Sequence, residues 1–398
     1  MQANWRVGSL FGIPLFLDPS WFFILVLVTI LNALNFSRRF DLAVAWSAGL
    51  LMALLLFASV LLHELGHSLV ARSQGIKVNS ITLFIFGGVA SIDRESKTPG
   101  QSFQVAIAGP AVSFALYGLL YGLAQVFPST SIGQVLALDL ARINLILGLF
   151  NLIPGLPLDG GQVLKAAVWK LTGSRFQGVR WAAQTGKFLG GLAIAVGLFF
   201  VLKGQPFAIW MTLIGWFVYR NANAYDRLTT LQEALLQLKA SDAMSRDFRV
   251  VDANQSLRSF ADEYILTDIH APIPYYAAAN GRYRGLVAIE ELQAIERSRW
   301  EIETLESIVY PLSEIATVEE KTPLLEVINR LESQKRPYLT VLSPAGAVAG
   351  VIDRGDIVRA VGTKLNLPFT QADIKRIKAE NSYPPGFQLS AIAQNIQQ

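Results

Sequence analysis

The chain has 398 residues, of which 52% are hydrophobic and only 16% are charged, and its mean hydropathy is +0.39. Because soluble domains usually carry about 25% charged residues, this composition excludes an ordinary soluble protein. Residues 1–225 carry a net charge of +8 and residues 226–398 a net charge of −4, which predicts a membrane domain followed by a soluble one. The basic residues form no run with interleaved aromatics, so we expect no nucleic-acid partner.

Six apolar segments in the first domain approach the length of about 20 residues that a membrane helix needs. They are residues 21–36, 43–71, 104–127, 135–152, 188–202 and 207–219. Residues 76–92 instead alternate in part and contain a Gly-Gly pair, which predicts a β-hairpin or a re-entrant loop. If the N-terminus is cytoplasmic, most Lys and Arg of the short loops lie on the inner side. We therefore expect an integral protein of the inner or plasma membrane, surrounded by lipid, with its C-terminal domain in the cytoplasm.

The soluble half contains an internal repeat. The stretch PYYAAANGRYRGLVAIEEL (274–292) parallels PYLTVLSPAGAVAGVIDRGDI (337–357), and the same spacing relates Gly285 to Gly350 and Glu291 to Asp356. Two copies of such a unit predict a paired α/β module. The expected organisation is a membrane domain at 1–225, a soluble domain at 226–379, and a loosely ordered C-terminal tail at 380–398.

A metal-binding pattern lies inside the second apolar segment, in SVLLHELGH (59–67). On a helix, His63 and His67 lie four residues apart on one face, so both imidazoles can reach one cation. Glu64 is placed to hold a water molecule, and the pattern HExxH thus combines two ligands and a general base. Ionisable residues at membrane depth usually mark function, so the stretch predicts a metal site.

A catalytic zinc takes three protein ligands, so a third must come from elsewhere. His270 lies in the soluble half and is a poor candidate, and the other acids of the membrane domain lie at span ends or in loops. Asp159 remains, in NLIPGLPLDGG (151–161), where we expect Gly160 and Gly161 to let the backbone pass close to the metal helix. The alternative is a polar loop in which Asp159 only caps a helix.

The motif HELGH, followed by N-x-x-P-x-x-x-L-D-G-G, resembles the site-2 protease family of intramembrane metalloproteases over residues 1–225. The Phe86-Gly87-Gly88 loop and the Gly109-Pro110-Ala111 stretch add to this resemblance. It implies one catalytic zinc ion on His63, His67 and Asp159, with Glu64 as the base. It also implies that Asn151 stabilises the oxyanion or holds the substrate.

Residues 76–92, with Phe86, Gly87 and Gly88, offer a strand edge that can bind an unwound substrate by β-addition. The alternative is a short structural hairpin that packs on the core. The candidates for the gate that admits substrate are the loop-rich segment 76–100 and the outer spans at 21–36 and 207–219.

The repeat resembles a tandem CBS module, a type of module that often binds adenine nucleotides. The family pattern places a small hydroxyl residue three positions before an acid that holds the ribose. Here the acids are Glu291 and Asp356, whereas the hydroxyl positions hold Ala288 and Asp353. Two hypotheses therefore stay open: adenine nucleotide binding at Glu291 and Asp356, and a structural module that forms a homodimer.

Together these patterns predict a polytopic α-helical membrane protein of about six spans, with a membrane-associated β-hairpin and a C-terminal α/β tandem CBS domain. The expected function is zinc-dependent intramembrane proteolysis of a single-span, membrane-anchored protein, in regulated proteolysis signalling. The alternative is a catalytically inactive membrane scaffold or transport protein regulated by its CBS domains. That alternative predicts a broken catalytic set, whereas His63, Glu64, His67 and Asp159 are all present.

Overall fold

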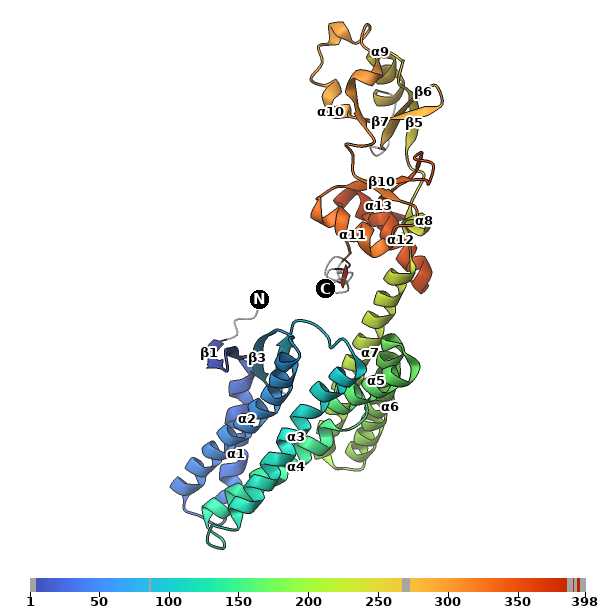
Figure 1. The fold of residues 1–398 in the computed structure, drawn as a ribbon. Helices are drawn as coiled ribbons and strands as arrows, with labels where there is room; N and C mark the ends of the chain where they lie inside the picture. The colour runs from blue at the N-terminus through green and yellow to red at the C-terminus, as the bar shows by residue number, and fades with distance from the viewer. Residues whose placement is uncertain (1–4, 86, 267–272, 385–388, 390–391, 394–398) are drawn as a thin grey trace. The chain divides into compact units, whose positions relative to one another are not determined.

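The computed structural model describes residues 5–85, 87–266, 273–384, 389 and 392–393. It contains two compact units, Met1–Thr229 and Thr230–Gln398, which correspond to the blue-to-green and the yellow-to-red parts of Figure 1. The division falls inside one helix, α7 (Ile209–Gln237).

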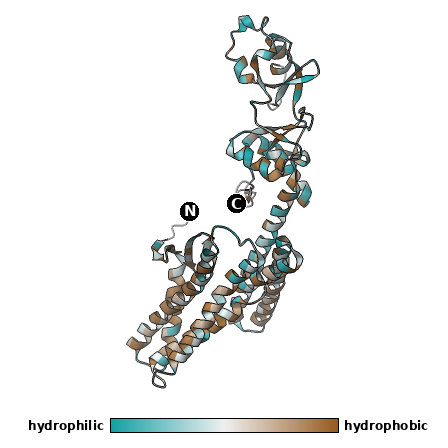
Figure 2. Cartoon of the chain, in the orientation of Figure 1, coloured by the Kyte–Doolittle hydropathy of each residue, from teal (hydrophilic) through white to brown (hydrophobic). Residues whose placement is uncertain are grey.

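Apolar helices dominate the first unit, as the brown colouring in Figure 2 shows. Its other helices are α1 (Ser20–Phe36), α2 (Leu42–Ser73), α3 (Pro99–Ala124), α4 (Ile132–Asn151), α5 (Asp159–Thr172), α6 (Arg175–Leu202) and the short η1 (Pro206–Ala208). Among the described residues, α2, α3, α4 and α6 are long and apolar enough to cross a membrane. The prediction of about six spans also included segments of α1, which is apolar but only 17 residues long, and of α7, which continues into polar sequence.

Local chemistry explains where these helices begin. The side chains of Thr98, Ser131 and Ser174 each accept a hydrogen bond from a backbone amide in the first turn of α3, α4 and α6, which satisfies one of the amides left free at a helix start. Pro110 lies inside α3 and does not interrupt it. Neighbouring helices in a membrane bundle can compensate the hydrogen bond that a proline removes.

A four-stranded sheet packs on α2 in the first unit, in the order β1 (Trp5–Leu10), β2 (Ile13–Leu17), β3 (Val78–Phe84) and β4 (Gly87–Ile92). The segment 76–92 provides β3 and β4, which pair antiparallel, while β2 and β3 pair parallel. The first two strands were not expected from the sequence. Because β4 is the last strand of this sheet, one of its edges has no strand partner among the described residues.

The second unit has two sheets with the same internal order, which is the structural form of the repeat. Strand β5 (Arg249–Asp252) lies parallel to β6 (Tyr275–Ala279), which pairs antiparallel with β7 (Arg282–Val287). In the second copy β9 (Thr317–Glu319), β10 (Tyr338–Leu342) and β11 (Val348–Asp353) repeat this arrangement. The remaining elements are α8 (Ala240–Ala243), α9 (Leu257–Phe260), η2 (Ala261–Ile265), α10 (Ile289–Leu292), η3 (Arg297–Arg299), η4 (Leu305–Ile308), β8 (Val309–Pro311), α11 (Leu324–Ser333), α12 (Arg354–Leu365) and α13 (Gln371–Glu380).

Most of the tail expected to be loosely ordered, residues 380–398, lies outside the described residues. Its described residues Leu389, Ile392 and Ala393 are buried in the hydrophobic core of the second copy. Apolar side chains at these positions gain free energy by leaving water, a gain that the sequence argument did not weigh.

Candidate metal centre

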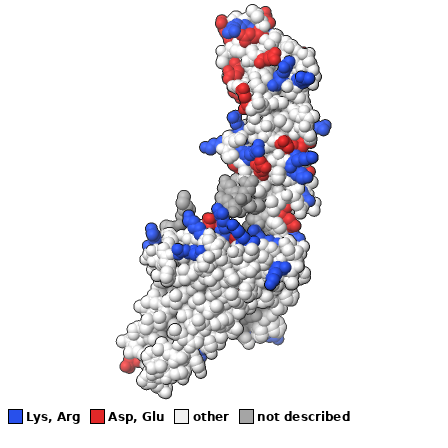
Figure 3. Space-filling model, viewed as in Figure 1, with Lys and Arg blue, Asp and Glu red and all other residues white. Residues whose placement is uncertain are grey.

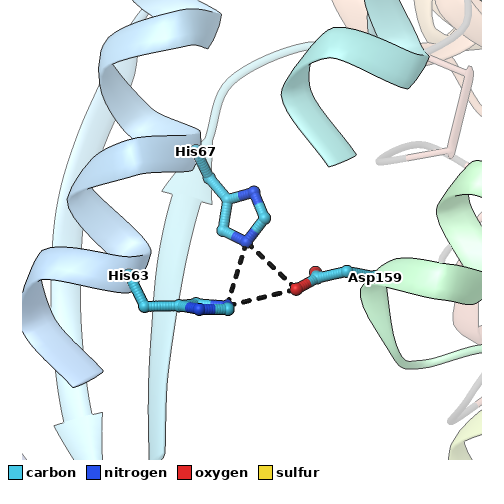
Figure 4. A group of neighbouring side chains, drawn as sticks. All are labelled: His63, His67 and Asp159. Carbon is cyan, nitrogen blue, oxygen red and sulfur yellow. Dashed lines mark hydrogen bonds and ion pairs between the residues drawn. The ribbon is translucent and has the colours of Figure 1, made fainter. Parts of the chain in front are cut away.

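The metal-binding pattern lies in the C-terminal half of α2, on the face turned toward α3 and α5. The imidazoles of His63 and His67 point into the space between these helices, where the carboxylate of Asp159 meets them (Figure 4). Both histidines are buried. His67 lies about 9 Å along the axis from the last residue of the helix, Ser73, at 1.5 Å per residue.

The three donor atoms have the spacing of a tetrahedral metal site. Asp159 Oδ2 lies 3.1 Å from His63 Nε2 and 3.3 Å from His67 Nε2, and the two Nε2 atoms are 3.3 Å apart. Zinc bonds of 2.0–2.1 Å imply a tetrahedral edge of about 3.3 Å. Within the described residues, these three form the group of metal-ligating side chains that could hold an ion, and they leave a fourth position for water.

Contacts on the far side of each imidazole orient the ligands. His67 Nδ1 lies 2.7 Å from the carbonyl oxygen of Val105, to which it donates, and His63 Nδ1 lies 2.9 Å from the hydroxyl of Ser113. A proton on Nδ1 leaves the Nε2 lone pair free for a metal, and such partners fix both tautomer and ring angle. Val105 and Ser113 both belong to α3, which therefore supports the site without contributing a ligand.

Gly109 of α3 is the point of closest approach to the histidines. A Cβ atom at this position would overlap His67 Nε2 and would lie 2.6 Å from His63 Nε2. No residue other than glycine therefore fits without displacing the two imidazoles. Three features fit a zinc ion: the space left open at Gly109, the spacing of the donor atoms, and the orientation of the two Nε2 atoms.

Asp159 is the first residue of α5, and Leu158 occupies the cap position. The alternative in which Asp159 only caps a helix is therefore wrong, because its carboxylate turns to the histidines. The expected role of the two glycines is also wrong: Gly160 and Gly161 lie against their own loop, where added Cβ atoms would overlap the Leu152 carbonyl and the Leu156 amide. They fold residues 152–156 onto the start of α5, which fixes the direction of Asp159.

Glu64 faces the sheet. A Cβ atom at Gly88 would lie 2.6 Å from Glu64 Cγ, and the backbone amide of Ala90 donates to the Glu64 carboxylate. Both contacts come from β4, the strand with a free edge in this sheet. The proposed base and the candidate substrate-binding strand are thus adjacent, although they come from separate parts of the motif pattern.

The other predicted site residues are less closely tied to the metal centre. Asn151 ends α4 and is half-buried, and Gly87 begins β4. Phe86 and His270 lie outside the described residues. Sequence reasoning missed Ser113 and Val105 and noted Gly109 only as part of a motif. The signal available for Gly109 was a glycine before a proline in an apolar helix.

In the second unit, the two acids proposed for a ribose have partners within the protein. Glu291 accepts a hydrogen bond from Tyr310. Asp356 is fully buried, and its carboxylate pairs with Lys378 at 3.0 Å and Arg359 at 2.9 Å and accepts from Ser245 at 3.2 Å. Burial and the neighbouring Asp353 raise the pKa of Asp356 to about 6, against the opposing effect of these cations.

Comparisons with known proteins agree with the chemistry of the donor set. A model of Peptidase family M50 matches residues 51–141 and 129–193, and a model of the CBS domain matches residues 306–363. A relative from Synechocystis sp., provisionally named a zinc metalloprotease, is 42% identical over 366 residues, which are 91% of this chain and 97% of the relative. A zinc metalloprotease of Methanocaldococcus jannaschii is 30% identical over 361 residues, with the same two coverages. The solved site-2 protease of that organism is 35% identical, covers 56% of this chain and 96% of its own, and superposes with a TM-score of 0.43.

The site and the apolar helices define an integral membrane zinc metalloprotease. The chain belongs to Peptidase family M50, the site-2 protease family, and carries a CBS domain at residues 306–363.

Proposed function

We propose that this protease cuts a single-span, membrane-anchored protein within the membrane, close to the cytoplasmic face, as a step in regulated proteolysis. The observation that carries the proposal is the adjacency of three parts: the His63–His67–Asp159 donor set, Glu64, and the free edge of β4. A membrane helix hides its peptide carbonyls in hydrogen bonds. A strand edge beside the metal would hold the unwound segment in a cleavable, extended form.

His63, His67 and Asp159 would hold the zinc, which when bound would supply a Lewis acid that polarises the peptide carbonyl and lowers the pKa of a water to about 7. Glu64 would accept a proton from the attacking water and return it to the leaving amine. The Ala90 amide and Gly88 hold the Glu64 side chain against β4, so the base faces the same edge as the substrate. Asn151 would donate to the oxyanion or to the substrate strand, a contribution worth a few kcal/mol for one well-placed donor.

If the substrate binds by strand addition, we infer that it pairs with the outer edge of β4. Thr82 and Phe84 lie on β3, which pairs on both sides, with β2 and with β4. Proline there would break the sheet itself. Ala90→Pro on β4 is the sharper change, because it removes an amide from the outer strand and adds bulk beside Glu64.

The orientation of the protein rests on charge. On the face seen in Figure 3, Lys and Arg gather at one end of the first unit, beside a broad surface almost free of charge. The end of α2 nearest the metal centre carries Arg72. From the positive-inside rule we infer that this end, and the C-terminal domain, are cytoplasmic.

For the CBS unit we propose a structural or dimerising role at the second copy, because Asp356 is already bound to Lys378, Arg359 and Ser245. A ribose would have to displace these partners. Calorimetry of the full-length protein with ATP, ADP and AMP tests this. Heat of binding at millimolar nucleotide that is lost in Asp356→Asn would refute it.

The protease function is tested with a designed single-span peptide of about 20 apolar residues that carries a central Asn-Pro pair and a fluorophore at each end. Wild type with one zinc should cut it. Glu64→Gln should bind zinc as tightly as wild type and should not cut. Equal cleavage by Glu64→Gln would exclude this mechanism, and a zinc-loaded wild type that cuts no membrane peptide would favour the scaffold alternative.

A further inference from the structure

A buried lysine outside the metal centre is paired in a way that the proposed function does not use. Lys165 of α5 is only 6% exposed, and its ammonium donates to Glu95 Oε2 at 3.1 Å. Arg175, the first residue of α6, places its Nε 3.4 Å from the same oxygen. Lys170, on the same helix, is instead exposed, as expected for a residue that only follows the positive-inside rule.

Glu95 is held as a charged group. Burial acts to raise its pKa, but the two neighbouring cations outweigh burial, and the pKa lies below its usual range. The Glu95 side chain is 49% exposed and only Lys165 is buried; because a buried lysine without a partner would be strongly unfavourable, Lys165 holds Glu95 beside it at neutral pH.

The backbone at Lys165 is packed closely against α6. A Cβ atom at Gly178 of α6 would lie 2.5 Å from the Lys165 carbonyl oxygen, so the backbones of α5 and α6 are in close contact at this point. Asp159 begins the same helix α5. The cations of Lys165 and Arg175 are therefore fixed relative to the third metal ligand.

Glu95 lies in the segment that connects two elements next to the metal centre, β4 and α3. This connection is short and comprises residues 93–98. One end of this connection leads to the strand that contacts Glu64, and the other leads to the helix whose Gly109 fits between the histidines. A contact at Glu95 thus couples the position of the β4 edge to α5.

We propose that the Glu95–Lys165 pair is a positioning contact, which holds the free edge of β4 in register with Asp159 so that an added peptide strand crosses the metal centre. The proposal rests on the proposed function of β4 as the substrate-binding edge. The zinc ligands do not depend on the pair, because His63 and His67 are oriented by α3 and Asp159 by the packed loop 152–156. Breaking the pair should therefore affect substrate docking more than zinc binding.

The test compares Lys165→Met and Glu95→Gln with Lys170→Met, which removes the same charge from an exposed site on the same helix. All are full-length proteins in nanodiscs. Hydrogen exchange of residues 87–98 should rise about tenfold in the first two variants, since local opening becomes easier, and should stay at the wild-type rate in Lys170→Met. Bound zinc should stay at the wild-type level in all three.

With the Asn-Pro peptide as probe, KM should rise about tenfold in Lys165→Met with a smaller change in kcat, because a misplacement of about 1 Å costs up to roughly 100-fold. Lys165→Arg keeps the cation and should restore the wild-type KM. Unchanged exchange at residues 87–98 would overturn the proposal. So would a parallel loss of zinc and of protection throughout the first unit, which is the signature of a merely structural pair.

If either single variant fails to fold, the double variant Lys165→Met/Glu95→Gln removes the buried lysine together with its partner charge, and only the partly exposed Arg175 loses a neighbour. Slow, wild-type exchange at residues 87–98 in this variant would also overturn the proposal. Exchange does not depend on cleavage, so failure of the peptide assay in wild type counts against the proposed function and not against the positioning contact.

Discussion

The replacement of Gly109 by alanine should destroy the metal centre without harming the helix. The new methyl group would lie 2.6 Å from His63 Nε2 and closer still to His67 Nε2, whereas ordinary contacts begin at 3.4 Å. His63 must therefore move by about 0.8 Å, which exceeds the tolerance of about 0.2 Å on a metal–ligand distance. Changes that only disturb the partners of a ligand cost 10–100-fold in affinity. We expect a loss of at least about 100-fold in zinc affinity here, or about 2.8 kcal/mol at 1.4 kcal/mol per factor of ten.

The assay for this prediction is a zinc competition titration against a chromophoric chelator, with thermal unfolding of the metal-free protein in parallel. Alanine is about 1 kcal/mol better than glycine in a helix interior, so α3 itself should not be weakened. Gly118→Ala is the matched control, because a Cβ atom at Gly118 of the same helix meets nothing within 4 Å. Tight zinc binding by Gly109→Ala, equal to that of Gly118→Ala, would refute the geometric reasoning.

Three further predictions concern the base, the buried acid of the second unit and the topology. Gly88→Ala should push Glu64 away from β4 and lower kcat about tenfold, as expected for disturbed general-base catalysis, while bound zinc stays at one per chain; an unchanged kcat would contradict the contact. The raised pKa of Asp356, about 6 against 3.8, means that the folded state binds this proton more tightly than the unfolded state. The tighter proton binding adds to the free energy of unfolding; this contribution is fully present below pH 3.8 and is lost as the pH rises to 6. Asp356→Asn should therefore gain up to about 3 kcal/mol over wild type across that window, measured by hydrogen exchange of α12, and a constant difference would argue against it. Because the chain has no cysteine, single cysteines at Gln205 and Lys321 report topology directly. A membrane-impermeant maleimide should label only the first in intact cells; labelling of the second alone would reverse the orientation, and labelling of both would contradict the span count.

Local patterns in the sequence predicted the parts of the site that depend on one helix. The spacing of His63 and His67 and the neighbouring Glu64 are properties of a single turn, and α2 presents them as expected. The partner Asp159 could be found because few acids occur in the apolar half of the chain. The direction of its side chain could not, because it depends on the close packing of Gly160 and Gly161 against residues 152–156.

Contacts between distant segments account for what the sequence did not reveal. The parallel pairing of β2 with β3 joins Leu15 to Ile81, and no local signal specifies such a pair. For this reason β3 was not recognised as an inner strand, and the free edge was not assigned to β4. The same holds in the second unit, where the internal repeat indicated the position of Asp356 but Lys378 comes from α13, a helix outside the repeat.

The division of the proposed metal ligands between α2 and α5 has a consequence for the biosynthesis of the protein. While the ribosome has synthesised only the first four helices, the growing chain carries two histidines and a base but lacks Asp159. Such a chain presents a two-ligand site, short of the three protein ligands that catalytic zinc sites use. With this proposed ligand set, proteolytic competence would be delayed until α5 has folded back onto α3, when most of the membrane unit is in place. A truncated product that ends before residue 159 would be inserted in the membrane yet harmless to its neighbours.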